Sequence, residues 1–372
     1  MKLLIVSEGY YPQIGGLEKI VTELAECLVK DKGYEVDVIT LTDAHDTRTE
    51  TIRGVNILYL PLSARHGKKA LIRELLRARR AVRRRLREKQ YDMVSLQYLG
   101  YMAAVYYFSR PKGQAYTVSI HGSDIMGLKN AVIRSLIGKI TAHAQTGISN
   151  SNYLLEKLKE LTPAGGFPRE KVIWNGIHLE RFQPAKAPCG RERVVAVGRF
   201  VQKKGFDILI RAFQTVARHR PEAELLLIGD GAERGGCEKL AQELGLEGRV
   251  TFAGRCTFDE TMAYLRQSEI YVLPSRAEAF GIVVLEGLAT GLPMVLTACG
   301  GAEEIVEGYD CGYIVPPEDP QAMAEKILAL LQDENTRARF RENGLKRVRA
   351  FSFDRFVDQY DQVWNGEKRD DQ

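Results

Sequence analysis

Two glutamates in the second half of the chain, Glu278 and Glu286, have the spacing and surroundings that most directly suggest chemistry. Glu286 lies in an aliphatic segment, where an unpaired buried carboxylate is costly, so it needs hydroxyl or cationic partners. A vicinal diol, such as that of a ribose, offers two hydroxyls to one carboxylate. Glu278 precedes an expected helix, and free backbone amides near Phe280–Ile282 would favour a phosphate or a sugar hydroxyl. The segment therefore indicates binding of a nucleotide or a phosphorylated sugar.

Two carboxylates would also fit the acid and nucleophile of a glycosidase. Sequence spacing leaves this alternative open, because it does not give the distance between the carboxyl groups. The phosphate-binding features described next make hydrolysis the second choice.

Two cations, Arg199 and Lys204, lie in the segment VGRFVQKKG, directly after a predicted strand. Cations at the carboxyl end of a strand, beside glycines and a following helix, suit a diphosphate. Lys203 is less favoured than Lys204 as a diphosphate contact, and only its register argues against it. The alternative is that these residues are surface charges without a ligand.

Two further candidates lie in the first half of the chain. Gly15 and Gly16 separate the first strand from the first helix, where backbone amides can approach a phosphate at the positive end of a helix dipole. His121 follows a strand in the segment HGSD and could hydrogen-bond a substrate hydroxyl or meet a developing charge. A plain turn and a structural histidine remain the alternatives.

Short aliphatic runs alternate with amphipathic segments along the whole chain, which predicts an α/β fold with parallel, doubly wound sheets. Residues 183–191 break this pattern with Pro, Ala, Lys and Gly and are expected to be a linker. We therefore expect two tandem Rossmann-like domains, 1–182 and 192–350, with a ligand cleft between them. Residues 351–372 contain a final helix, for which packing back on the first domain is one option. The predicted strands are 3–6, 35–41, 55–60, 93–96, 115–120, 145–148, 193–197, 223–228, 250–252, 270–273 and 293–296.

The composition indicates a globular protein that is expected to be cytoplasmic. Of 372 residues, 45% are hydrophobic and 27% are charged, which is enough for two packed domains and excludes a disordered or collagen-like chain. Six scattered cysteines form no metal-ligand pattern and are expected to be reduced thiols. The first apolar run is too short for a signal peptide, and no run is long enough to span a membrane.

Residues 65–89 carry twelve Lys and Arg against two Glu, although the whole chain has a net charge of only +5. Apolar residues recur every three to four positions, so an amphipathic helix with a cationic face is expected. This face could be the solvated side of a helix that covers the first sheet, or it could bind anionic lipid headgroups at a membrane. Nucleic acid is disfavoured, because no aromatic residues interleave with the charges.

Taken together, these segments resemble the retaining glycosyltransferases of family 4, which have the GT-B fold. The likeness covers nearly the whole chain, and the ordered set of motifs is far more specific than any one of them. The segments that carry it are Gly15-Gly16, His121-Gly122-Ser123-Asp124, Asn175-Gly176-Ile177, Gly198-Arg199, Lys203-Lys204-Gly205, Gly229-Asp230-Gly231, the Glu278–Glu286 pair and Gly300-Gly301-Ala302-Glu303-Glu304.

The resemblance implies transfer of a sugar from a nucleoside-diphosphate donor to an acceptor hydroxyl, with retention at the anomeric carbon. It implies that Arg199 and Lys204 bind the diphosphate and stabilise the leaving charge. It assigns the ribose to Glu286, and the hydroxyls of the donor sugar to Glu278 with the backbone of Ala279, Phe280, Gly281 and Ile282.

The same resemblance assigns the distal phosphate to the Gly15-Gly16 turn, through the Gly16 amide, and places His121 near the reacting carbon. It implies no metal and no other cofactor. The acceptor is unknown, with a lipid-linked acceptor in cell-envelope glycan or glycolipid synthesis as one option. Two residues depart from the family pattern: His178 stands where Asp is frequent, and Ala279 where Gly is frequent.

A second function class stays open, that of a non-catalytic nucleotide-sugar-binding partner in a glycan-assembly complex. The joint presence of His121, Arg199, Lys204 and both glutamates argues against it. An epimerase or a phosphorylase of the same fold is a weaker third option.

Overall fold

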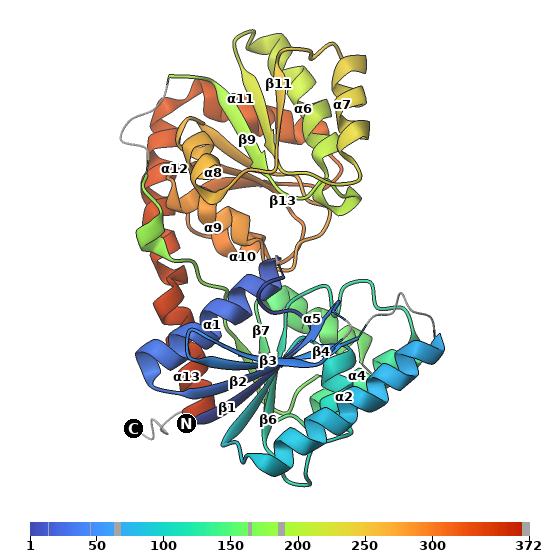
Figure 1. Ribbon diagram of the computed structural model, residues 1–372. Helices are drawn as coiled ribbons and strands as arrows, with labels where there is room; N and C mark the ends of the chain where they lie inside the picture. Colours follow the sequence, from blue (N-terminus) through green and yellow to red (C-terminus); the bar gives the residue numbers. More distant parts are fainter. Residues whose placement is uncertain (14, 45, 63–67, 163–165, 185–189, 367–372) are drawn as a thin grey trace. The chain divides into compact units, whose positions relative to one another are not determined.

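The chain forms two compact units, each built on its own sheet (Figure 1). Unit 1 comprises Met1–Trp174 and the segment that starts at Phe356, and unit 2 comprises Asn175–Arg355. These limits differ from the expected ones at 182/183 and 350/351, and part of the expected linker, 185–189, lies outside the described residues. The protein is described here by a computed structural model for residues 1–13, 15–44, 46–62, 68–162, 166–184 and 190–366.

The sheet of unit 1 has eight strands in the order β3-β4-β2-β1-β5-β6-β7-β8. Strand β1 pairs in parallel with both β2 and β5, so the strand order reverses at β1. Ligands of doubly wound sheets bind at the carboxyl ends of the strands beside such a switch point. The strands are β1 (Lys2–Ser7), β2 (Glu35–Thr42), β3 (Arg48–Ile52), β4 (Val55–Pro61), β5 (Met93–Gln97), β6 (Tyr116–Ile120), β7 (Thr146–Ser149) and β8 (Glu170–Val172).

One strand pair corrects the expectation of a wholly parallel sheet. Strand β3 runs antiparallel to β4, and their hairpin turns at Arg53 and Gly54, whose φ angles are 47° and 82°. Two successive positive φ values are typical of a type I′ hairpin turn. The sequence did not predict β3 or β8, because β3 is polar and mostly exposed and β8 has three residues.

The helices of unit 1 cover the sheet, and α1 shows how their sequences bring this about. Ile20, Val21, Leu24 and Leu28 of α1 are buried and recur at the predicted spacing of three to four residues. The helices are α1 (Gly16–Lys32), α2 (Lys68–Glu88), α3 (Tyr101–Tyr107), α4 (Ala131–Ala142), α5 (Asn152–Leu161) and, from Phe356 onward, α13 (Phe353–Asn365), whose first residues belong to unit 2.

The final helix, α13, packs on unit 1, where Figure 1 shows it in red. The Tyr360 hydroxyl donates to Ser119 Oγ (3.1 Å), and the Trp364 indole N–H donates to Thr117 Oγ1 (3.0 Å). Both acceptors lie on β6, so the end of the described chain is fixed to the centre of the sheet.

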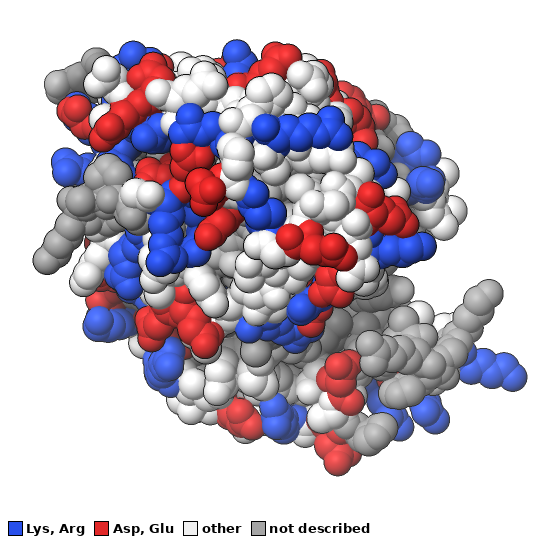
Figure 2. Space-filling model, turned by 90° about the horizontal axis from the view of Figure 1, so that it is seen from above, with Lys and Arg blue, Asp and Glu red and all other residues white. Residues whose placement is uncertain are grey.

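Helix α2 is the expected basic helix, although residues 65–67 of that segment lie outside the described residues. Arg73, Arg77, Arg80 and Arg84 are exposed on it. On the face of the molecule shown in Figure 2, by comparison, Lys and Arg are intermixed with Asp and Glu. None of the helices in the described residues is both long and apolar enough to cross a bilayer.

The sheet of unit 2 has six parallel strands in the order β11-β10-β9-β12-β13-β14. Its switch point lies between β9 and β12, the two central strands of the sheet. The strands are β9 (Arg193–Val197), β10 (Glu224–Ile228), β11 (Val250–Gly254), β12 (Ile270–Leu273), β13 (Met294–Thr297) and β14 (Gly312–Val315), of which only β14 was not predicted.

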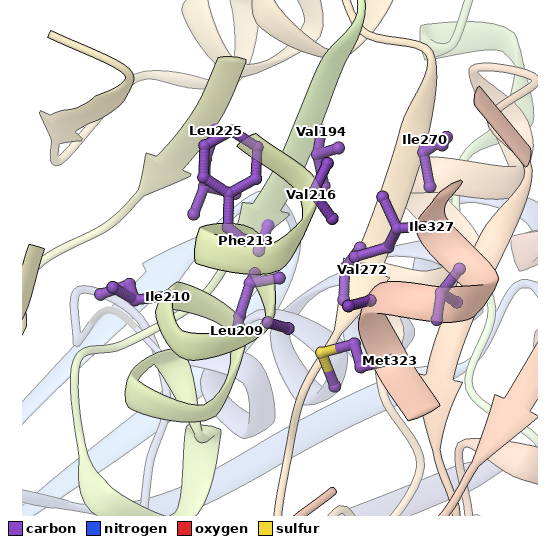
Figure 3. Packing of buried hydrophobic residues seen from close by; sticks show 14 of the residues in the cluster. Val194, Leu209, Ile210, Phe213, Val216, Leu225, Ile270, Val272, Met323 and Ile327 are labelled. Carbon is purple, nitrogen blue, oxygen red and sulfur yellow. The ribbon is translucent and has the colours of Figure 1, made fainter. Parts of the chain in front are cut away.

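Helices α6 and α11 bury their apolar faces on this sheet (Figure 3). Leu209 and Phe213 of α6 and Ile327 of α11 are fully buried in one cluster with strand residues such as Val194. Burying a side chain of this size contributes about 1.5–3 kcal/mol, so the cluster fixes the strand ends that carry the site. The helices of unit 2 are η2 (Leu179–Arg181), η3 (Gln202–Lys204), α6 (Phe206–His219), α7 (Arg234–Glu243), α8 (Phe258–Arg266), α9 (Ile282–Ala289), α10 (Glu303–Val306), α11 (Pro320–Gln332), α12 (Glu334–Arg347) and η4 (Val348–Phe351).

Candidate functional site

The loops that follow β9 and β12 meet at the switch point of unit 2. The Arg276 amide of the second loop donates to the Lys203 carbonyl of the first (2.8 Å). Gly205 ends η3 with a φ of 64°, and a Cβ at this position would lie 2.0 Å from the Pro274 carbonyl oxygen. This close approach of the two backbones therefore requires glycine at position 205.

Lys204 and Glu278 join the same two loops through an ion pair between Nζ and Oε2. The two side chains are only 14% and 16% exposed. The sequence predicted separate ligands for them, a diphosphate for Lys204 and sugar hydroxyls for Glu278. In the structure each is the partner of the other, so the ion pair fixes the position of both charges.

The backbone of Glu278 is fixed as firmly as its side chain. Its amide donates to the Cys299 carbonyl (2.9 Å), and its carbonyl accepts from the Gly301 amide (2.9 Å). The Gly300-Gly301 segment thus holds Glu278 against the end of β13. The sequence identified both segments but not the contact between them.

Helix α9 begins at Ile282, a few residues after Glu278, and its N-cap makes no side-chain hydrogen bond. Its N-cap is Gly281, with a φ of 91°, and Phe280 anchors the turn because it is buried against Phe351 (ring centroids 6.1 Å apart). The first amides of a helix lack intrahelical acceptors and favour an anionic or hydroxyl ligand. Ala279 and Ile282 flank this turn and are partly buried.

Glu286 lies one turn into α9 and is partly buried. Tyr271, on β12, is its buried neighbour. Burial, reinforced by the negative charges of Glu286 and Glu278, raises the pKa of the Tyr271 hydroxyl. Both carboxylates therefore lie close enough to the switch point to raise the pKa of the same buried tyrosine hydroxyl.

Arg199 is exposed, and no carboxylate among the described residues lies within ion-pair distance of it. Partial burial lowers the pKa of the neighbouring Lys203, with Lys204 and Arg199 adding to the effect and Glu278 opposing it. Three positive side chains therefore lie around one carboxylate. The sequence set Lys203 aside, but its place in this group makes it a candidate as well.

Arg276 is a site residue that sequence reasoning missed. Its guanidinium donates to both carboxylate oxygens of Asp207 (2.8 Å each) and to the Gln202 carbonyl (2.7 Å), and it also pairs with Glu318. Arg276 and Asp207 also line a pocket of about 420 Å³, whose lining does not include Arg199, Lys204 or Glu278. Two acidic partners occupy this arginine, so it is suited to holding η3 in place. Its position two residues before Glu278 is the feature of the sequence that could have indicated Arg276.

In unit 1, Gly15 is the N-cap of α1 and Gly16 is its first residue. A Cβ on Gly15 would lie 2.1 Å from Oε2 of Glu18, whereas nothing in the described residues lies within 4 Å of the corresponding position at Gly16. The carboxylate of Glu18 therefore occupies space beside the turn where the sequence predicted a phosphate.

His121 lies at the carboxyl end of β6, and its backbone and ring are both held. Its amide and that of Gly122 donate to Asp124 Oδ1 (3.2 and 2.7 Å), and its Nε2 lies 3.0 Å from Gln97 Oε1. Burial lowers the pKa of His121 to about 4, so the imidazole is neutral near pH 7. A neutral ring can hydrogen-bond a hydroxyl but supplies no positive charge to a phosphate.

Three further residues near His121 were not identified from the sequence as site residues. Burial raises the pKa of Asp124, opposed by the amides that donate to it. Burial also raises the pKa of Glu8, whose Oε1 accepts from the Met102 amide (3.2 Å). Tyr98 has a φ of 110°, a backbone strain that functional sites often carry. Asp124 belongs to a motif that the sequence analysis identified, whereas only their position at the carboxyl ends of β1 and β5 could have indicated Glu8 and Tyr98.

Two family comparisons together cover almost the whole chain. Glycosyltransferase Family 4 matches residues 14–181, and Glycosyl transferases group 1 matches residues 179–347. The chain belongs to the family 4 glycosyltransferases.

Curated relatives agree with this assignment, and solved structures share the fold of the chain. The chain is 29% identical to an uncharacterized glycosyltransferase of Methanocaldococcus jannaschii over 361 residues, 96% of each chain. It is 38% identical to the lipopolysaccharide core biosynthesis glycosyltransferase LpsE of Rhizobium meliloti over 48% of this chain and 50% of that protein. Sucrose-phosphate synthase from Thermosynechococcus elongatus has the same fold, with a TM-score of 0.82 and 24% identity over 98% of both chains. Anabaena HepE, solved in complex with UDP and glucose, has a TM-score of 0.78 and 19% identity over 98% of this chain and 100% of that chain.

The glycosyltransferase has the predicted GT-B architecture, and unit 2 brings together most of the predicted donor residues. Arg199 and Lys204 come from the loop after β9, and Glu278, Gly281 and Glu286 from the loop and helix after β12. Gly15, Gly16 and His121 lie in unit 1 at the carboxyl ends of its strands. Within the described residues, no three His, Cys, Asp or Glu side chains are grouped so that they could hold a metal ion.

Proposed function

We propose that this glycosyltransferase transfers a hexosyl group from a nucleoside-diphosphate sugar to an acceptor hydroxyl, with retention of the anomeric configuration. One observation carries the proposal: a group of cations and two carboxylates, contributed by separate loops, meet at the switch point of unit 2. Doubly wound sheets bind nucleotides at this point.

Arg199 and Lys204 are proposed to bind the diphosphate. As the bond to the sugar breaks, negative charge grows on the leaving phosphate, and fixed cations stabilise that charge without reorganisation. Lys204 is prepositioned by Glu278, so the diphosphate has to share or replace this carboxylate as its partner. With two cations in this role, the proposal requires no metal and no other cofactor.

Glu286 is proposed to bind the two ribose hydroxyls, as a carboxylate on the first turns of α9 can do. The hydroxyls of the donor sugar would be held by Glu278 and by the backbone of Ala279–Ile282. The start of α9 supports this assignment, because its N-cap, Gly281, makes no side-chain hydrogen bond and the first amides of a helix favour an anionic or hydroxyl ligand.

In unit 1, the Gly15-Gly16 turn is proposed to bind the distal phosphate through the Gly16 amide, and His121 to bind a sugar hydroxyl near the reacting carbon. The acceptor hydroxyl would attack on the face that the diphosphate leaves, through an oxocarbenium-like state, which accounts for retention. The proton of the attacking hydroxyl would pass to the departing phosphate oxygen.

We further propose a UDP-sugar as donor and a cell-envelope polysaccharide or glycolipid as product. The relatives support the proposed product, since one acts in lipopolysaccharide core biosynthesis and another is a phosphatidylinositol N-acetylglucosaminyltransferase subunit of Schizosaccharomyces pombe. The complex of Anabaena HepE with UDP and glucose supports the proposed donor. The enzyme would then work in the cytoplasm, at the inner face of the membrane. The cationic face of α2 would bind anionic headgroups there, with the exposed Ile72 and Leu76 beside its arginines entering the interface.

The proposal is tested by thermal unfolding in the presence of UDP, GDP and ADP sugars, followed by transfer assays with the donor that stabilises the protein. A ligand at 100 times its Kd adds about 2.7 kcal/mol to the free energy of unfolding. NMR of the product then reports the anomeric configuration. Failure of every nucleotide sugar to stabilise the protein would refute the proposal, and stabilisation without transfer or donor hydrolysis would favour the non-catalytic binding partner.

A further inference from the structure

Gln97, the last residue of β5, is fully buried next to His121. Its side-chain amide nitrogen donates to Ser95 Oγ (2.9 Å), and its Oε1 lies 3.0 Å from His121 Nε2. The same side chain also hydrogen-bonds the Tyr360 hydroxyl of α13. Gln97 therefore has a buried polar partner on each side.

The partners of the Gln97 amide group lie on opposite sides of it. Its nitrogen faces Ser95 and Tyr360, whose hydroxyl oxygens both accept hydrogen bonds. The Tyr360 hydroxyl in turn donates to Ser119 Oγ (3.1 Å). Gln97 Oε1 faces His121 in this arrangement, and an oxygen there requires a proton on Nε2.

We infer that Gln97 is a positioning residue that fixes His121 in its neutral Nε2–H form, so that Nδ1 accepts a hydrogen bond from a sugar hydroxyl. No partner of Nδ1 is found among the described residues. This inference deepens the proposed function and rests on it, because it names the chemical group that His121 recognises. A hydroxyl can donate to Nδ1, whereas a phosphate oxygen cannot.

The charged and titratable groups around the ring are compatible with a neutral imidazole. Asp124, from the loop after β6, accepts the amides of His121 and Gly122. Tyr360, from α13, stays protonated because burial raises its pKa to about 12. Glu8 and Tyr98, from the loops after β1 and β5, have their pKa values raised by burial as well.

The wild-type protein alone can test the tautomer. We would record long-range ¹H–¹⁵N spectra of protein labelled at its six histidines, assign His121 by comparison with His121→Asn, and titrate from pH 8 to pH 5. The expected result is an Nε2–H ring that stays neutral over this range. An Nδ1–H ring, or protonation with a midpoint near the ordinary value of about 6.5, would overturn the inference.

Gln97→Glu then tests what Nδ1 does. The carboxylate would stabilise the imidazolium and raise the pKa of His121, and the protonated ring could no longer accept a hydrogen bond at Nδ1. We expect kcat/KM of this variant to fall about tenfold per pH unit below the new pKa, and to recover above it, while the wild type stays flat. Gln332→Glu, the same change on an exposed residue, should leave the profile unchanged.

A Gln97→Glu profile that stays flat although NMR shows a raised pKa for His121 would overturn the role of Nδ1. If Gln97→Glu does not fold, Gln97→Met replaces it: loss of the Nε2–H form and a lower kcat support the inference, and unchanged values of both overturn it. A wild type that transfers no sugar would refute the proposed function instead, and the tautomer measurement would still stand on its own.

Discussion

At the scale of single residues, the ion pair between Lys204 and Glu278 is the feature that prepares the site for a nucleotide. A lysine side chain loses rotamer freedom when a ligand orders it, which costs binding free energy. In this structure Glu278 orders the Lys204 side chain through their ion pair, and both side chains are largely buried. The pair therefore fixes the position of the positive charge at the switch point, and the diphosphate shares or replaces Glu278 as its partner.

Removing this charge should act mainly on the transition state. Replacing Lys204 or Arg199 by Ala is expected to lower kcat/KM by about 10²–10³-fold, or about 2.7–4 kcal/mol, since each cation stabilises the leaving phosphate. Steady-state kinetics with the preferred nucleotide sugar provides the measurement. Lys239→Ala, at an exposed position of α7, is the matched control. Activity within a few-fold of wild type for both site variants would remove the proposed diphosphate contacts.

At the scale of elements, Arg276 links three segments that come from distant parts of the chain. It connects the loop after β12 with η3 through the Gln202 carbonyl, with α6 through Asp207, and with the turn before α11 through Glu318. Because Gln202 begins η3 and Lys204 ends it, these contacts fix the element that carries the cation. Arg276 thus holds the site without being available to a ligand itself.

Arg276→Gln should weaken nucleotide binding indirectly. The variant loses hydrogen bonds to charged groups, which are worth about 1.5–3 kcal/mol each in buried settings and less here, since Asp207 and Glu318 are partly exposed. We expect a lower free energy of unfolding and a higher Kd for the nucleoside diphosphate, measured by denaturation and calorimetry. Arg276→Lys should recover only part of the affinity, because lysine cannot bind Asp207 bidentately. Arg218→Gln, at an exposed position of α6, serves as the control, and an unchanged Kd in Arg276→Gln would contradict the positioning role.

Helix α2 supports a second prediction at this scale. Each basic residue near an anionic membrane contributes about 1 kcal/mol, so replacing Arg77, Arg80 and Arg84 by Gln should weaken binding to anionic vesicles about 10²-fold. Co-sedimentation with anionic and with neutral vesicles at two salt concentrations measures this effect. The same three changes at exposed basic residues of unit 2, namely Arg218, Lys239 and Arg255, should have no effect. Equal binding of the wild type to neutral and anionic vesicles would show that α2 does not dock electrostatically.

At the scale of the whole molecule, the sequence predicted the strands rich in aliphatic residues, because a buried parallel strand needs apolar side chains on both faces. It missed β3, whose Arg48–Ile52 segment is polar, since that strand lies at the edge of the sheet and needs no apolar pattern. It identified Lys204 and Glu278 separately but could not pair them, because their contact depends on which strands flank the switch point. For the same reason, Gln97 and Tyr360 could not be connected to His121: they meet only once α13 has packed on unit 1.

The return of α13 to unit 1 means that the two ends of the described chain stabilise the same sheet. Trp364 is 5% exposed, and its replacement by Ala would leave a cavity next to β6, which typically costs about 3–5 kcal/mol. Because unit 2 has its own core around Phe213 and Ile327, the loss should be confined to unit 1. Hydrogen exchange should therefore show faster exchange for the amides of β5 and β6 and unchanged protection for β9 and β12. Asp358→Ala, at an exposed position of the same helix, should leave both sheets protected, and an equal loss of protection in both units would mean that they unfold as one cooperative body.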